Sequence, residues 1–111
     1  MSRATRTLCL VYAILAVVAL VVTWSWNFAF FAGPDAGLGS FLAGAYANPA
    51  AASLSSDLLF LTLVAMVWMV VEARRHGIGF VWLYVAMGFA VAISVAFPLF
   101  LIARERRLAA R

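Results

Sequence analysis

Two acidic residues flank a long apolar stretch in the middle of the chain. Asp57 precedes the run Leu58–Val71, and Glu72 follows it. At 100° per residue both acids fall on one face of a helix, within about a quarter-turn of each other. An acid inside a membrane is costly unless it is paired or hydrated, and such acids mark proton relays and cation sites. We expect Asp57 to lie at the membrane interface and to bond to Asn27 or to loop N–H groups; a proton or cation site and recognition of a partner subunit are the functional alternatives.

A polar and aromatic layer is expected around Asp57. If three long helices run antiparallel, Asp57 lies at the depth where the first helix is rich in tryptophan and the last carries Pro98. Pro98 cannot donate to the carbonyl of Ser94, which leaves that oxygen available to another donor. The predicted layer contains Asp57, Asn27, Trp24, Trp26, Ser94 and Pro98. Its tryptophans indicate either an interfacial aromatic belt or a ring-lined ligand pocket.

The second acid lies beside three basic residues. Glu72 is followed within about one helical turn by Arg74, Arg75 and His76. This spacing predicts an ion-pair and anchor cluster at the membrane surface, because long cationic side chains reach the interface from a helix end. A site for the headgroup of an anionic lipid is the functional alternative.

Catalytic and metal chemistry lacks the residues that it needs. His76 is the single histidine and Cys9 the single cysteine, so one chain cannot build a bis-histidine haem site, a zinc site or an intrachain disulfide. No serine has a histidine and an acid placed for nucleophilic catalysis, and no glycine-rich phosphate loop follows a strand. We expect no catalytic residue, no metal, no cofactor and no enzymatic activity.

The composition indicates a membrane protein. The 111 residues are 68% hydrophobic and 11% charged, with a mean hydropathy of +1.09. A soluble domain of this size could not bury so much apolar surface. The net charge of +4 comes from arginines at the ends of apolar runs. Such arginines anchor and orient membrane spans, which argues for the lipid bilayer and against nucleic acid as a partner.

We expect an all-α membrane protein, one integral domain over 1–111, with three transmembrane helices and a short interfacial helix between the first and second. The spans fall at about 7–32, 54–73 and 80–103, and the loop or interfacial segment at 33–53. Asn48 and Pro49 predict the start of the helix that contains the second span, and Gly77 predicts its end. The ~12 residues before Asn48 would reach only about 18 Å, which excludes a fourth span.

Small residues recur in the predicted third span. Gly88, Ala92 and Ala96 would form a stripe at every fourth position, the pattern that lets a second helix approach closely. We expect this stripe to pack against a membrane-protein partner or a second copy of the chain.

Charge alone leaves the orientation of three spans undecided. Four arginines would lie on each side of the membrane: Arg3, Arg6, Arg74 and Arg75 on one, and Arg104, Arg106, Arg107 and Arg111 on the other. The segment 36–56 contains no lysine or arginine, which suits the outside. We therefore expect the N-terminus in the cytoplasm.

Several spaced motifs resemble a known family. They are Ala47-Asn48, Ser53, Asp57-Leu58, Glu72-x-Arg74-Arg75-x-Gly77, Trp82, Ser94-x-Ala96-x-Pro98-Leu99-Phe100-Leu101 and Arg104-Glu105. In these the chain resembles the small bacterial membrane proteins grouped as domain of unknown function family twenty-eight thirty-four. The first span is less similar, since the family has a proline near Trp24-Ser25-Trp26. The resemblance implies a three-span protein of the bacterial cytoplasmic (inner) membrane and brings no activity with it.

The sequence favours an accessory or scaffold subunit that associates with other membrane proteins. One alternative is a homo-oligomeric, proton- or cation-coupled transporter-like protein that uses Asp57. A second is a lipid or pigment binder that uses the aromatic layer.

Overall fold

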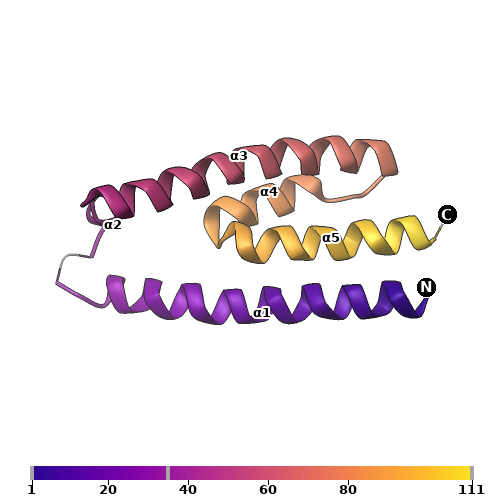
Figure 1. Ribbon diagram of the computed structural model, residues 1–111, viewed down its shortest axis with the longest axis horizontal. Helices are drawn as coiled ribbons and strands as arrows, with labels where there is room; N and C mark the ends of the chain where they lie inside the picture. Colours follow the sequence, from indigo (N-terminus) through magenta and orange to yellow (C-terminus); the bar gives the residue numbers. More distant parts are fainter. Residues whose placement is uncertain (1, 35, 111) are drawn as a thin grey trace.

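The computed structural model describes residues 2–34 and 36–110, and over these residues the protein is all-α. The helices are α1 (Arg3–Phe31), α2 (Leu38–Ala45), α3 (Pro49–His76), α4 (Val81–Ala90) and α5 (Ile93–Ala109). They form an elongated bundle of 51 × 24 × 23 Å. Both chain termini and the α3–α4 loop lie at one end of the bundle, whereas α2 lies at the other (Figure 1).

Within the described residues, α1 and α3 are the two helices long and apolar enough to cross a membrane. They contain 29 and 28 residues, so each is about 42 Å long, more than the ~30 Å of a hydrocarbon core. α4 is a third, shorter apolar helix. Most side chains of α1 are exposed along its whole length, with Ala16 as its one buried residue.

The predicted ends of α3 are confirmed. The Asn48 side-chain oxygen Oδ1 accepts a hydrogen bond from the Ala51 backbone N–H at 2.8 Å, and Pro49 is the first helical residue. Gly77 ends the helix with a φ of 65°, a left-handed conformation that costs glycine nothing. The long helix therefore begins and ends where local chemistry places its caps.

The continuous helix expected over 80–103 is wrong. α4 and α5 are instead two antiparallel helices joined at Val91 and Ala92, and α5 returns toward the end where α4 began (Figure 1). Ala92 is extended, with φ −177° and ψ 143°. The indole nitrogen of Trp24 donates to the Val91 carbonyl at 3.1 Å, so α1 satisfies an oxygen that the break frees. We call the pair the α4–α5 hairpin.

α5 occupies the centre of the bundle and packs against α1, α3 and α4. Phe100 is fully buried and meets Trp68 of α3 and Tyr84 of α4 edge-on. Met66, Met69 and Ala73 complete this core. The turn of the hairpin therefore places α5 in contact with α1, α3 and α4.

The stripe expected from Gly88, Ala92 and Ala96 is not formed, because the chain reverses at Ala92. Gly88 lies in α4 against Met66 and Ile93, and Ala96 is fully buried in α5. Both residues pack inside the chain. Their small size lets α3, α4 and α5 approach one another, and neither is free to receive a partner helix.

A larger residue at Gly88 tests this packing. A Cβ atom there would overlap Cε of Met66, so we expect Gly88→Leu to lower the free energy of unfolding by about 1–3 kcal/mol, the usual cost of overpacking. Gly44→Leu is the matched control, because nothing lies within 4 Å of a Cβ at Gly44 in α2. Thermal unfolding in detergent measures both; equal midpoints for the two variants would contradict the hairpin packing.

Candidate functional site

A group of paired charged side chains surrounds Glu72, in the last turns of α3. Glu72 is 5% exposed. Nε of Arg104 donates to its Oε2 at 2.7 Å, and Nε2 of His76 and Nη1 of Arg75 lie 3.4 and 3.6 Å from its carboxylate oxygens. A buried carboxylate needs such partners, because an unpaired charge away from water is strongly unfavourable. Glu72 therefore joins α3 to α5.

Arg104 is the member of this cluster that sequence reasoning did not place there. Its guanidinium carbon lies 5.5 Å from the centroid of the Trp68 ring, and its Nη1 lies 3.4 Å from Oε1 of Glu105. The α4–α5 hairpin brings Arg104 beside Glu72, whereas the expected third span would have carried it to the opposite side. In the sequence, the Arg104-Glu105 pair at the end of an apolar run was the feature that could have drawn attention to Arg104. Its pairing with Glu72 arises only because the chain reverses.

The predicted cluster of Glu72, Arg74, Arg75 and His76 is thus partly gathered. Arg75 and His76 lie next to Glu72, and Arg74 is exposed on the same turn of α3. These charge pairs hold α3 and α5 together at the end of the bundle where both chain termini lie, which we call the termini end.

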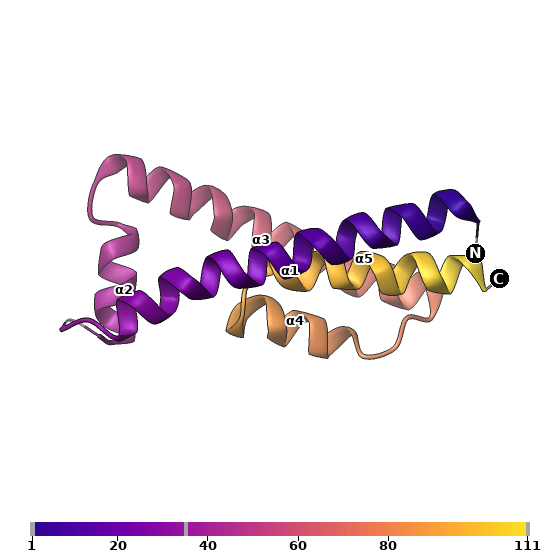
Figure 2. The ribbon, with the colours of Figure 1, turned by 90° about the horizontal axis from the view of Figure 1, so that it is seen from below.

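An apolar crevice lies between α1, α3 and the first two turns of α5. Its volume is about 550 Å³. Its lining comes from three helices: Leu15 and Ala19 of α1, Leu58, Leu61, Val64, Ala65 and Trp68 of α3, and Ile93, Ser94, Phe97 and Pro98 of α5. α1 and α3 diverge toward α2 beyond this point (Figure 2). Ser94 supplies the polar group of an otherwise apolar wall.

The predicted polar layer is divided between two places. Trp24, Ser94 and Pro98 lie at the hairpin tip, where Trp24 binds Val91 and the other two line the crevice. Asn27 is half-buried on α1. Trp26 is 74% exposed, and Asp57 is exposed with no hydrogen bond or ion pair to any residue that the structure describes.

The reason for this division is the length of α5. α5 begins at Ile93, which packs against the core that contains Met66 and Met69 of α3. It therefore covers Glu72 and leaves Asp57, on the same side of α3, uncovered. The expected shared depth of Asp57 and Pro98 required a third helix of full length.

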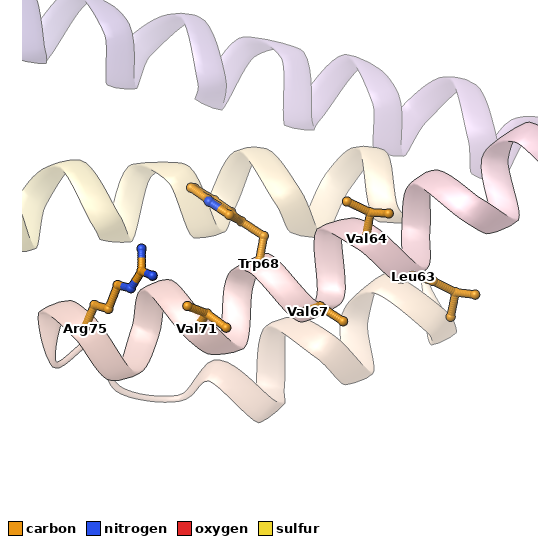
Figure 3. A pocket seen from close by; sticks show the side chains of 6 residues that line it. All are labelled: Leu63, Val64, Val67, Trp68, Val71 and Arg75. Atoms are coloured by element: carbon orange, nitrogen blue, oxygen red, sulfur yellow. The ribbon is translucent and has the colours of Figure 1, made fainter.

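A second, shallower groove follows the outer face of α3. Figure 3 shows its lining, Leu63, Val64, Val67, Trp68, Val71 and Arg75, along one side of the helix. Its volume is about 460 Å³. Arg75 closes the groove at the termini end, so an apolar strip runs up to a charged group.

The chain belongs to the family described as Protein of unknown function DUF2834, which it matches over residues 11–106. This is the family that its spaced motifs resemble. No curated protein and no solved structure matches the chain. Family membership carries no activity, so function has to be argued from the geometry.

The Glu72 cluster generates a stability prediction. Glu72→Gln keeps the shape of the side chain but removes the negative charge that Arg104, Arg75 and His76 approach. We expect its thermal unfolding midpoint in detergent to fall by several degrees. Glu105→Gln removes an equal charge from the longer, 3.4 Å contact to Arg104 and should shift the midpoint much less. A midpoint for Glu72→Gln equal to that for Glu105→Gln would show that Glu72 does not join α3 to α5.

Proposed function

We propose that this chain is an integral membrane protein in which α1 and α3 cross the bilayer and the α4–α5 hairpin enters it and returns. Support comes from the length and hydropathy of α1 and α3 and from their exposed apolar side chains. From Ile93 to Arg104, α5 extends about 17 Å, roughly half of a hydrocarbon core. A re-entrant segment needs its backbone covered by protein, and α1, α3 and α4 cover it here. On this proposal α2 lies along the far interface.

Because the hairpin turns the chain back, the arginines of α5 lie at the same end of the bundle as those of α1 and α3. The described arginines (Arg3, Arg6, Arg74, Arg75, Arg104, Arg106 and Arg107) belong to the N-terminal turns of α1 and the last turns of α3 and α5, which all lie at one end of the bundle (Figure 1). The α2 end has no arginine or lysine among its residues. By the preference of cationic loops for the cytoplasm, the termini end faces the cytoplasm of a bacterial cell.

We further propose that the protein is an accessory subunit whose crevice between α1 and α3 receives a transmembrane helix of another membrane protein. The crevice carries this proposal because it is lined by the small residues Ala19 and Ala65 beside larger ones, a surface that permits close helix contact. Ser94 and the carbonyl that Pro98 deprives of its usual donor add hydrogen-bonding groups. Such groups favour a polar side chain on a partner helix over an acyl chain.

The alternative, a proton- or cation-coupled role for Asp57, has less support. Its carboxylate is exposed and lies outside the residues that line the crevice. Acids that bind a proton or cation inside a membrane pair with one another or with other polar groups, and among the described residues no group of three His, Cys, Asp or Glu side chains could hold a metal ion.

The membrane topology can be measured with reporter fusions. We expect green fluorescent protein fused after Arg111 to fluoresce in bacterial cells, because this reporter folds in the cytoplasm and the hairpin returns the C-terminus to the side of the N-terminus. Alkaline phosphatase fused at the same point should be inactive. Phosphatase activity without fluorescence would show that the C-terminus lies outside the cytoplasm. This result would support three full spans and contradict the re-entrant hairpin.

The partner helix can be trapped by photocrosslinking in cells. A photoreactive phenylalanine analogue at Leu61 should give one discrete adduct with another membrane protein, because Leu61 lines the crevice. Phe60 is the matched control position: it has a similar exposure, 67% against 60%, and does not line the crevice. We expect no adduct there.

A filling variant tests whether the crevice itself is required. Ala19→Trp should abolish the Leu61 adduct by occupying the crevice, whereas Val21→Trp, on the opposite side of α1, should leave it unchanged. Adducts with a second copy of the chain, or with no protein, would contradict an accessory role.

A further inference from the structure

A pocket with arginines on one wall and an aromatic residue on another lies at the termini end of the bundle. It forms between the α3–α4 loop and the last turns of α5, with a volume of about 400 Å³. Arg106, Arg107 and Tyr84 supply its polar groups, and Phe80 and Ile78 its apolar ones. This loop pocket is separate from both the crevice and the Glu72 cluster, since it shares no lining residue with either.

The loop pocket is positively charged, because Arg106 and Arg107 line it and the nearby Glu72 and Glu105 pair with Arg104. Glu72 and Glu105 both bind Arg104, and neither lines the loop pocket. Arg106 and Arg107 are exposed there. No acidic residue is among the residues that line it, so the pocket is complementary to an anion.

The chain holds one of the two arginines in place. Nε of Arg107 donates to the His76 carbonyl at 2.8 Å, and its guanidinium packs against Gly77. Guanidinium carries five N–H donors, so this bond leaves donors for a ligand. Guanidinium groups bind phosphate oxygens through parallel hydrogen bonds, which makes phosphate the anion that two neighbouring arginines suit best.

The apolar side of the pocket points to a lipid. Phe80 lines the pocket and is 82% exposed, with a left-handed φ of 63°. Trp82, two residues later and outside the pocket lining, is 65% exposed. Exposed aromatic residues beside arginines at a helix end are typical of the membrane interface. A free phosphate ion would use only the arginines, whereas a phospholipid would use the arginines and the aromatic residues together.

We propose that the loop pocket binds the phosphate headgroup of an anionic phospholipid from the leaflet on the side of the termini. The proposal rests on the membrane orientation argued above and is independent of the partner helix. Arg106 and Arg107 bind the phosphate, and Phe80 and Trp82 lie beside the upper acyl chains. The bound lipid holds the α3–α4 loop against the end of α5.

Native mass spectrometry of the purified full chain tests the proposal. The protein in detergent is offered phosphatidylglycerol and phosphatidylcholine with identical acyl chains, and the ratio of the retained lipids is measured. We expect wild type to retain phosphatidylglycerol preferentially and Arg106→Gln to lower this ratio about five-fold, the typical worth of one arginine near a membrane surface. Arg3→Gln removes the same charge at the same end, outside the pocket, and should leave the ratio unchanged.

Three outcomes would overturn the proposal. Equal retention of the two lipids by wild type would show that the pocket has no preference for an anionic lipid. An equal loss in Arg106→Gln and Arg3→Gln would assign the preference to overall charge. Displacement of phosphatidylglycerol by millimolar inorganic phosphate would make the site one for free phosphate. Circular dichroism shows that each variant is folded, and the reporter fusions test the orientation separately, so failure of the pocket and failure of the topology give different results.

Discussion

α5 is held at both ends by bonds to different helices, and the arrangement of the bundle depends on these two contacts. Near its C-terminal end, Arg104 donates to the buried carboxylate of Glu72 on α3. Just before its first residue, the Val91 carbonyl accepts from Trp24 on α1. Because α5 packs along α1 and also against α3, it fixes the spacing of the two long helices.

The same constraint explains where the molecule is packed and where it is open. Phe100, Met69 and Ala96 are fully buried where α5 lies between its neighbours. The apolar crevice lies beside the first two turns of α5, between α1 and α3. Because the hairpin is about half as long as α1 and α3, the half of the bundle near the termini has a packed core, and the half near α2 contains the crevice. The partner binding proposed for the crevice and the lipid binding proposed for the loop pocket would both follow from this one chain reversal.

The parts of the fold that depend on local chemistry were predictable from the sequence. Asn48, Pro49 and Gly77 bound α3 because each acts on backbone groups within one turn of itself. The apolar runs likewise indicated α1 and α3. The break at Val91 and Ala92 was missed because neither residue is a glycine or a proline. At the break the Val91 carbonyl accepts a hydrogen bond from Trp24, 67 residues away in sequence, and a local sequence pattern cannot predict such a contact.

The candidate sites follow the same division. Arg75 and His76 could be assigned to Glu72 because they share its helix, whereas Arg104 reaches Glu72 only after the chain reverses. Asp57 was grouped with Pro98 on the assumption of a full-length third helix, and the hairpin separates them. The sequence thus placed Arg75 and His76 beside Glu72, but it did not place Arg104 there, and Arg74 is exposed on the same helix.

The most direct test of the re-entrant hairpin is a distance between the two ends of the chain in a lipid bilayer. Spin labels at Arg6 and Ala109, introduced in a Cys9→Ser background, can be measured by pulsed electron–electron double resonance. The hairpin predicts one short distance, because the first turns of α1 and the last turn of α5 lie side by side at one end (Figures 1 and 2). A distance of ~30 Å or more, the thickness of the hydrocarbon core, would place the two ends on opposite sides and contradict this account.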